Sequence, residues 1–450
     1  MNEKNINIEF VNHASVLVNN NEVGILSDPW YSGSIFNKGW KLIYENKKVY
    51  IKEVLLRVNY IYISHEHPDH FNVHFFNDDE FKDIILNNKI KILFQETRDK
   101  RVKNFLINKG YEVIECSDNK LIKLNKNLSI KINKHDFYDS SILVKLNDSN
   151  ILNINDSPLR EKDVLKRFAK KIGPIDILLT QFSYAAWKGG KNENKFRKLN
   201  ANEKINNILL QANIIKPKYI IPFASYIFFS NYMNFYMNDE INSPKKVYDE
   251  LVNNKHRAII MRPQESQNIL TLKQDQYSID FWENKFKDLK LNKLDIYDTK
   301  ISLDNLNNEF LNYKKKLFKK NSYFFILILS KFKFLNLFQK INIFLIDHNQ
   351  NYEFNIFSGL KIINTTNSHI KMHSESLLFI FKNEFGYDTL TVNGCFEASF
   401  KNFSLVSKTL ALGSLNAMGI NLNLNVLFKF NIIFLFLNKL KKFVNKSNNI

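Results

Sequence analysis

The sequence predicts an α/β fold in which β-sheet forms the middle layers and helices cover the outside. Between residues 60 and 225, short apolar runs such as "KIKILF" and "IDILLT" alternate with stretches of helical pattern, which is typical of strands covered by helices. One of the apolar runs leads directly into a cluster of histidines. Because the chain has 450 residues, too many for one hydrophobic core, we expect at least two domains.

The first 30 residues predict a β-hairpin. An alternating run in "INIEFVNHASVLV" is followed by a polar turn at residues 19–21 and by the apolar run "VGILS", which ends at Asp28 and Pro29. Apolar runs on both sides of a polar turn are the signature of paired strands. The later run "NYIYIS" predicts a buried strand, and the histidine cluster is therefore the loop that leaves this strand.

The cluster reads "SHEHPDH" at residues 64–70 and contains three of the ten histidines of the chain. Imidazoles this close would repel one another if protonated, so the arrangement favours a divalent metal among them. His65 and His67 are two residues apart and point the same way in an extended segment, where they can hold one ion. Asp69 and His70 lie where the chain turns, and they can serve a neighbouring ion.

The pattern H-x-H-x-D-H resembles the signature of the metallo-β-lactamase fold superfamily. The resemblance implies an αββα sandwich, a third ligand of the first metal at a later strand end, and an aspartate that bridges both metals at another. His135 in "KINKHD" and Asp156 in "ILNIND" stand in these two contexts. Asp28 resembles the early aspartate of the fold, which holds the metal loop from behind the ligands.

Two other segments bear on the metal site. His13 in "NHASVLV" resembles the histidine of the "GHAS/T" opening of one branch of the superfamily, and we place it outside the ligands, with a backbone hydrogen bond or a substrate contact as its role. Relatives commonly carry a last histidine, a ligand of the second metal, in a segment of the form strand, Pro, x, His. Here the segment reads "YIIPFASY", with Ala224 at the histidine position.

We therefore expect one or two divalent ions, zinc or iron, with a second site that is weak, differently ligated or suited to iron.

Longer stretches look like the metal-binding portion of the CMP-N-acetylneuraminate hydroxylase group and its bacterial cousins, which occur among surface-polysaccharide functions. These stretches include "LLTQFSYAAW" and "FGYDTLTVNGCFEAS", and the resemblance covers most of residues 6–270 and a patch near 385–400. Hydroxylases of that group also carry a Rieske module, which needs two cysteines and two histidines in pairs. Cys116 and Cys395 are far apart, so we expect any electrons to come from a separate protein.

Three functions follow from these patterns. We expect a metal-dependent hydrolase that acts on a phosphorylated or nucleotide-linked small molecule, because a bound metal activates water and Asp69 can accept its proton. The alternatives are a di-iron oxygenase related to the sialic-acid hydroxylases and an inactive binding or scaffold protein that kept the fold.

Strand-exit loops offer residues for substrate contact. Aromatic and hydroxyl side chains there could shape a pocket for a sugar or another ring, with core packing as the alternative; they are Tyr184, Trp187, Ser225 and Tyr226. Lys188 and Arg197 in the adjoining polar loop could meet a phosphate.

Charge and hydropathy limit the classes of molecule that the chain is expected to bind. The formal charge of +19 comes mostly from scattered lysines, and no nucleic-acid-binding signature accompanies it, so we expect an anionic small-molecule substrate and no nucleic acid. The N-terminus has no apolar core of signal-peptide length, and runs such as residues 323–329 are too short to span a bilayer. We therefore expect a cytoplasmic protein, whose oligomeric state the sequence does not indicate.

The pattern changes after residue 275. We expect the metal-binding domain to span residues 1–275, a helical connector 276–310, and a smaller α+β C-terminal domain 311–450. Apolar residues at helical spacing, with lysines among them, make residues 425–446 a predicted basic amphipathic helix. Such a helix either contacts a membrane surface peripherally or docks on its own domain.

Overall fold

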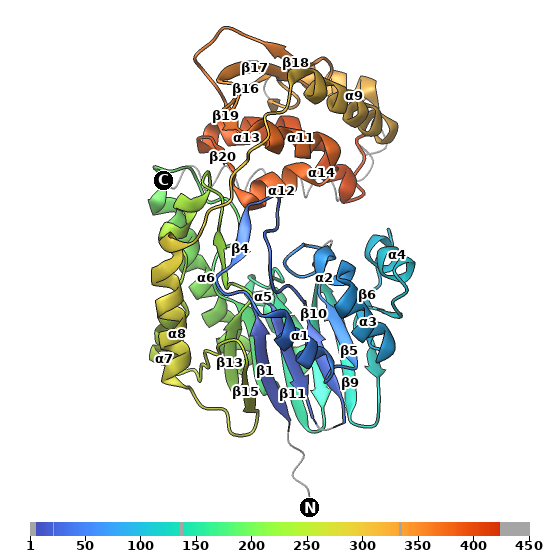
Figure 1. The fold of residues 1–450 in the computed structure, drawn as a ribbon, viewed down its shortest axis with the longest axis vertical. Coiled ribbons are helices and arrows are strands. Elements are labelled where there is room, and N and C mark those ends of the chain that lie inside the picture. Colours follow the sequence, from blue (N-terminus) through green and yellow to red (C-terminus); the bar gives the residue numbers. More distant parts are fainter. Residues whose placement is uncertain (1–5, 21, 136–137, 333–334, 424–450) are drawn as a thin grey trace, which may run out of the picture.

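A computed structural model describes residues 6–20, 22–135, 138–332 and 335–423 of the chain. Two large sheets pack face to face in the first part, and a smaller unit made of the C-terminal residues lies on top of them (Figure 1). The amphipathic helix predicted at residues 425–446 lies outside the described residues. Within the described residues, no helix has the length and apolarity needed to cross a membrane.

The first sheet has seven strands and contains the predicted hairpin. Its strands β1 to β3 are antiparallel neighbours, whereas β3, β5, β6 and β7 run parallel. Parallel strands end at the same edge, and that edge carries the histidine loop after β5. In sheet order the strands are β15 (Glu265–Asn268), β1 (Asn7–Asn12), β2 (Ser15–Asn19), β3 (Gly24–Ser27), β5 (Tyr60–Ile63), β6 (Lys91–Gln95) and β7 (Val113–Cys116).

The second sheet has six strands. Strands β8 to β11 are antiparallel neighbours, and β12 and β13 continue the sheet in parallel with β11. The ends of β11 and β13 therefore lie at one edge. In sheet order the strands are β13 (Tyr219–Phe223), β12 (Ile177–Gln181), β11 (Ser149–Asn155), β10 (Asp139–Leu146), β9 (Leu128–His135) and β8 (Leu121–Lys123).

Helices cover the outer faces of both sheets. The main core lies between the sheets, and two further clusters of buried side chains lie between each sheet and its helices. This is the αββα sandwich that the sequence predicts. One face carries α1 (Lys48–Leu55), α2 (Val73–Asn77), α3 (Asp79–Asn87) and α4 (Arg101–Asn108), the other carries α5 (Lys162–Ile172) and α6 (Asn194–Ile215), and α7 (Pro244–Asn253) and α8 (Gln276–Lys287) pack along the side.

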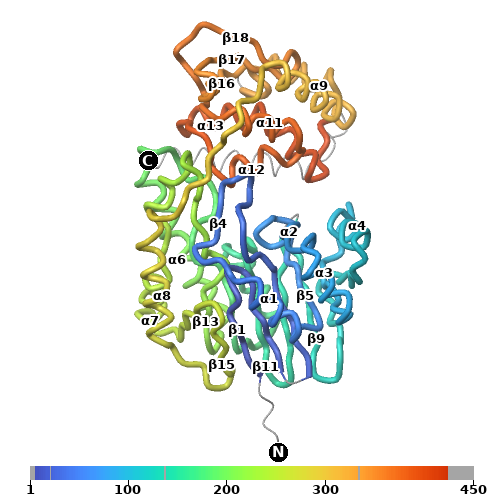
Figure 2. The backbone as a smooth tube through the Cα atoms, viewed as in Figure 1, coloured from blue at the N-terminus to red at the C-terminus, as the bar shows by residue number. Residues whose placement is uncertain are grey.

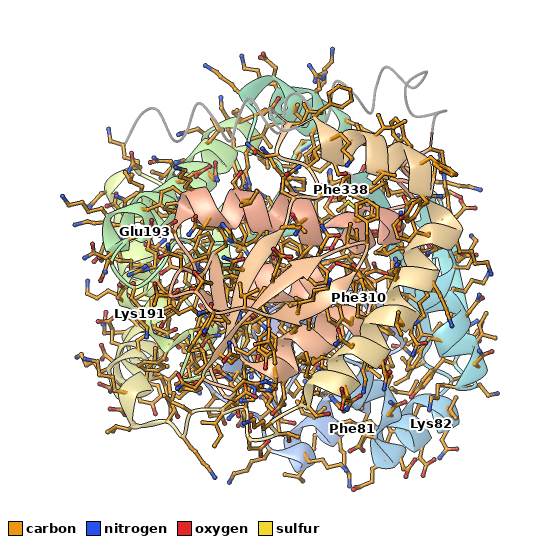
Figure 3. The ribbon with its side chains drawn as sticks, turned by 90° about the horizontal axis from the view of Figure 1, so that it is seen from above. Phe81, Lys82, Lys191, Glu193, Phe310 and Phe338 are labelled. Atoms are coloured by element: carbon orange, nitrogen blue, oxygen red, sulfur yellow. The ribbon has the colours of Figure 1, made fainter. Side chains whose placement is uncertain are left out.

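The C-terminal unit is a five-stranded sheet with helices. Phe310 of α9 packs against the sheet, where its ring lies 5.4 Å from that of Phe354 (Figure 3). The strands in order are β18 (Gly359–Ile362), β17 (Gln350–Asn355), β16 (Ile341–Leu345), β19 (Ile370–Met372) and β20 (Phe396–Glu397). The helices are α9 (Leu303–Lys320), α10 (Tyr323–Lys331), α11 (Ser374–Lys382), α12 (Gly386–Asn393), α13 (Phe400–Leu410) and α14 (Leu412–Ala417).

The residues predicted as a connector divide between the two parts. Helix α8 and the short helix η2 (Asp288–Leu291) bury Trp282 and Leu289 in the core of the sandwich. Helix α9, in contrast, begins at Leu303 and packs on the C-terminal sheet. Residues 292–302 join them.

Contacts between the two parts lie at the edge where the parallel strands end. Strand β4 (Trp40–Leu42), which pairs with β14 (Ile227–Phe229), reaches up to α12 (Figure 2). The side chain of Asn393 donates a hydrogen bond to the carbonyl of Phe36 (2.9 Å), and that of Asn234, just before helix η1 (Phe235–Glu240), donates to the carbonyls of Gly39 (2.8 Å) and Asn393 (2.6 Å). The metal-loop edge of the sandwich therefore faces the C-terminal unit.

Candidate metal centre

The histidine loop leaves the buried end of β5 in a tight, well-supported turn. The carbonyl of His67 accepts hydrogen bonds from the N–H groups of His70 (2.9 Å) and Phe71 (2.7 Å). Asn72 then caps α2 by accepting from the N–H of Phe75 (3.0 Å). The carbonyl of Ser64 is held by Ser140 Oγ (2.6 Å) of the opposite sheet. The loop is thereby fixed to both sheets.

His70 belongs to two groups of side chains that could each hold a metal ion. In one group, the donor atoms of His65, His70 and Asp156 all lie within 4.8 Å of one another, and in the other the same holds for His13, Asp69 and His70. His70 Nε2 lies 3.2 Å from Asp69 Oδ2 and 3.6 Å from Asp156 Oδ2. The two groups are therefore adjacent and share one imidazole.

His67 lies beside His65, a member of the first group. Its Nδ1 atom lies 2.8 Å from Nε2 of His65, so the two ring nitrogens converge on one point as their spacing predicts. Two neutral nitrogens cannot both accept, and a proton or a cation must lie between them. Because His67 is exposed whereas His65 and His70 are buried, this is the side of the centre that meets solvent.

Asp28 lies behind the histidine loop and contacts Ser64 and His70. Its Oδ2 atom is 2.9 Å from His70 Nδ1 and accepts from Ser64 Oγ (2.9 Å), and its Oδ1 atom accepts from the Ser64 N–H (2.7 Å). A carboxylate on Nδ1 fixes the proton there and leaves the Nε2 lone pair for a metal. Burial raises the pKa of Asp28, and His70 opposes that shift.

The structure differs from the sequence prediction at His135. The imidazole contacts Ser141 Oγ at 2.8 Å and the ring of Phe168 on α5 at 5.3 Å, on the outer side of the second sheet. Side chains alternate along β9, and because Ile130 and Ile132 face the inner core, His135 faces outward. Asp139, the first residue of β10, instead brings Oδ1 to 4.0 Å from His65 Nε2 at the sheet edge. The carboxylate of Asp139, rather than His135, is thus the β9–β10 side chain beside His65.

The four residues predicted to contact substrate lie in the protein interior. Tyr226 stacks on Trp282 with ring centres 4.1 Å apart, and Ser225 Oγ accepts from the N–H groups of residues 182 and 183. Tyr184 donates its hydroxyl hydrogen to the carbonyl of Met237. Trp187 packs against three phenylalanine rings of the C-terminal unit, Phe396, Phe400 and Phe403. All four are buried. The three aromatic side chains pack against other residues of the protein.

Arg197 also differs from its prediction as a phosphate ligand. Its guanidinium is buried, pairs with Asp239 at 2.6 Å and donates to the carbonyl of Gly190. A guanidinium whose donors are satisfied inside the protein is not available to an anion.

A chain of polar side chains that sequence patterns did not reveal runs from the centre to α6. Gln181 Nε2 donates to Asp156 Oδ1 (3.1 Å), and Lys204 Nζ donates to Gln181 Oε1. Burial, together with the nearby charges of Arg160 and Lys188, lowers the pKa of Lys204 to about 7, although Asp156 opposes this shift. The only signal in the sequence was that Lys204 stands among apolar residues of α6. That position alone does not distinguish a buried lysine from one on the surface.

The electrostatics of the centre demand a positive charge. Burial would lower the pKa of His70, but Asp69, Asp28 and Asp156 raise it well above its ordinary value. Burial would raise the pKa of Asp156, but His70 lowers it to about 2. Burial lowers the pKa of His65 well below its usual range, with His70 and His67 adding to that shift, so its lone pair is available at neutral pH. Either a protonated His70 or a bound cation can balance the three carboxylates.

The donors present fit a metal. Several buried polar atoms at this point have no hydrogen-bond partner among the described residues: both ring nitrogens of His13, Oδ1 of Asp69 and Nε2 of His70. Buried polar atoms are normally paired, and imidazole with carboxylate oxygen is a donor set that zinc and iron both accept.

Comparisons with known proteins give short or distant likenesses. No family model matches the chain. The cytidine monophosphate-N-acetylneuraminic acid hydroxylase of Danio rerio is 33% identical over 67 residues, which are 15% of this chain and 11% of the hydroxylase. A Mycobacterium tuberculosis protein described as a Rieske 2Fe-2S iron-sulfur protein is 26% identical over 187 residues, 39% of this chain and 34% of that protein. The chain thus spans about a tenth and about a third of the lengths of these relatives.

Solved structures are similar over somewhat more than half of this chain. The diiron β-hydroxylase CmlA of Streptomyces venezuelae is 13% identical, covering 59% of this chain and 54% of its own, with a TM-score of 0.42. A metallo hydrolase of Ignicoccus hospitalis is 15% identical, covering 58% of this chain and 97% of its own, with a TM-score of 0.40. Within this chain, two facing sheets, helices on both outer faces and an H-x-H-x-D-H loop at the end of β5 make up the metallo-β-lactamase fold.

Proposed function

We propose that the chain is a metal-dependent hydrolase that acts on an anionic small molecule, phosphorylated or linked to a nucleotide. The observation that carries the proposal is His70, which places two potential cation positions side by side by sharing its imidazole between two donor groups. Two adjacent metals are the arrangement by which many enzymes cleave phosphate esters and amides.

The residues of the chain would divide the work as follows. His65, His67, His70 and Asp156 would hold metal, which when bound supplies an activated water and polarises the bond to be cleaved. Asp69 reaches the same point and keeps Oδ1 without a hydrogen-bond partner among the described residues, so that oxygen can take a proton from the attacking water. Asp28 orients His70 through Nδ1.

Basic side chains beside the centre support an anionic substrate. Lys204 is joined to Asp156 through Gln181, and Arg160 and Lys188 lie near enough to lower the pKa of Lys204. Three cationic groups beside a metal centre create a positive potential that draws in a phosphate or carboxylate.

The test is hydrolysis by metal-loaded protein. The full chain would be stripped with chelator, loaded in parallel with zinc, manganese or ferrous iron, and assayed with bis(4-nitrophenyl) phosphate and with nucleotide-linked sugars. We expect hydrolysis that requires metal and is lost in Asp69→Asn. Metal-loaded protein that hydrolyses none of these esters would contradict the proposal, and a chain that binds no metal would favour a scaffold.

One observation favours an oxygenase as the second candidate. Asp139 Oδ1 stands 4.0 Å from His65 Nε2, and His67 Nδ1 lies 2.8 Å from the same nitrogen. Two imidazoles and one carboxylate are the types of donor that many iron oxygenases use. The name of the Danio rerio relative suggests a nucleotide-linked sugar as the substrate of such a reaction. Iron-dependent oxygen uptake with a reductant and a CMP-sugar, without hydrolysis in the zinc form, would favour this candidate over the hydrolase.

A further inference from the structure

We infer that His13 is a ligand of the second metal and occupies the role that the alanine at position 224 leaves open. The inference rests on the metal centre of the proposed function, and it moves His13 from support of the centre into its donor set. It would give the second ion a third donor beside Asp69 and His70.

The position of the imidazole is the first support. His13 Nε2 lies 3.5 Å from Asp69 Oδ2, and its donor atom lies within 4.8 Å of those of Asp69 and His70. The side chain is only 2% exposed. Apart from this approach to Asp69, neither ring nitrogen has a hydrogen-bond partner among the described residues, a costly state for a buried imidazole that has no further function.

The surroundings hold the ring in place without engaging its nitrogens. The ring packs edge-on against Trp30 at 5.5 Å, and the N–H of His13 donates to Asn12 Oδ1 (2.9 Å). Asn12 in turn donates to the carbonyl of Tyr44 (2.7 Å) and to Asn46 Oδ1 (2.6 Å). These contacts orient the ring, whose Nε2 atom approaches the centre at Asp69.

Backbone strain is the second support. His13 has φ 34°, in the left-handed region that residues other than glycine seldom adopt. This conformation costs free energy and persists where the surrounding structure enforces it, often at functional sites. His13 is the first of the two residues between β1 and β2, a position at which two-residue hairpin turns have positive φ. Here a histidine, rather than a glycine or asparagine, fills it, and its imidazole enters the centre.

Position 224 is the third support. The N–H of Ala224 donates to the carbonyl of His13 (2.7 Å), so the end of β13, where relatives place their last histidine, touches the residue that carries an imidazole here. The two positions are therefore in direct contact beside the centre.

Metal stoichiometry tests the inference independently of activity. The full chain would be stripped, saturated with zinc or cobalt, desalted and analysed for metal by mass spectrometry, with circular dichroism to check the fold. We expect about two ions per chain in the parent, as in two-metal sites, and about one in His13→Ala. Adding imidazole should return the second ion to His13→Ala, because a free imidazole can enter the space left by the side chain.

Two further variants sharpen the result. His74→Ala removes an exposed histidine of the same region and should keep both ions. His13→Gln keeps a polar side chain beside Trp30 and covers the case in which alanine unfolds the chain; it too should hold one ion. Retention of two ions in folded His13 variants overturns the inference and leaves the hydrolase intact. A parent with one ion overturns the inference, and the hydrolysis assay described above then decides the proposed function. A parent with none overturns both.

Discussion

The N–H of Ala224 donates a hydrogen bond of 2.7 Å to the carbonyl of His13, and both residues adopt positive φ, 52° and 34°. The bond joins the ends of β13 and β1, strands of different sheets, beside the metal centre. Asp28 and Asn155, at two other strand ends around the centre, have positive φ as well, 35° and 44°. The centre is therefore bounded by four strand ends in a strained conformation, which the packing of the sandwich enforces.

Exchange of the residues at positions 13 and 224 should preserve the second ion. The double variant His13→Ala with Ala224→His should bind about two ions per chain, where His13→Ala alone binds one, because the new imidazole starts from the neighbouring strand end. Mass spectrometry of desalted, metal-saturated protein measures this. A double variant that stays at one ion would show that position 224 does not reach the centre.

Asp28→Asn should weaken metal binding about ten- to a hundredfold, because the amide cannot hold the proton of His70 Nδ1 as the carboxylate does. Competition with a chromophoric chelator gives the affinity. Asp79→Asn, which changes an exposed acid of α3, is the matched control and should leave the affinity unchanged. Equal affinities for the parent and Asp28→Asn would mean that Asp28 merely ends its strand.

His135→Ala and Asp139→Ala should differ in their effect on the first metal. We expect Asp139→Ala to lower the affinity of that site about tenfold or more, because its carboxylate stands beside His65, and His135→Ala to change it little, because its imidazole contacts Ser141 and Phe168. Calorimetric titration of the stripped proteins distinguishes them. A larger loss of metal affinity in His135→Ala than in Asp139→Ala would show that His135 is a ligand after all.

Binding of an anionic substrate should weaken as the pH rises through about 7, the pKa to which burial lowers Lys204. Below that pH the ammonium is charged and attracts the anion; above it the neutral amine does not. KM measured from pH 6 to 9 should rise in the parent. It should be high and flat in Lys204→Gln but low and flat in Lys204→Arg, whose guanidinium stays protonated. Lys195→Gln on an exposed position of the same helix should behave like the parent.

Trp187→Ala should destabilise the chain by about 3–5 kcal/mol, the usual loss when a buried aromatic side chain is removed, because it packs among Phe396, Phe400 and Phe403. Urea denaturation followed by circular dichroism measures the free energy of unfolding. Metal affinity should not change. Unaltered stability together with a raised KM would show that Trp187 contacts substrate after all.

The layered fold and the histidine loop could be predicted because their signals are local. The alternation of apolar runs marks the strands, and the spacing of His65 and His67 alone makes their nitrogens converge, at 2.8 Å in the structure. The position of Asp28 could also be predicted from the sequence, because it follows a strand of the same sheet as the loop.

The remaining parts of the centre depend on long-range packing. His13 enters it only because β1 and β13 meet across two sheets, and no pattern in either segment encodes that contact. His135 is different: Ile130 and Ile132 face the inner core, so alternation along β9 already indicated that a side chain three residues beyond Ile132 points outward. The aromatic residues after β12 and β13 were ambiguous, because packing and ring recognition use the same side chains.

The apolar cluster that joins the two parts affects the thermal unfolding of the chain and its tolerance of truncation. Trp40 and Trp187 of the sandwich share this cluster with Phe310, Phe381 and other residues of the C-terminal unit. A truncation near residue 300 would leave those indoles in water and invite aggregation. The two parts should therefore unfold in one calorimetric transition rather than two. The C-terminal unit and the sandwich are thus expected to fold as a single unit.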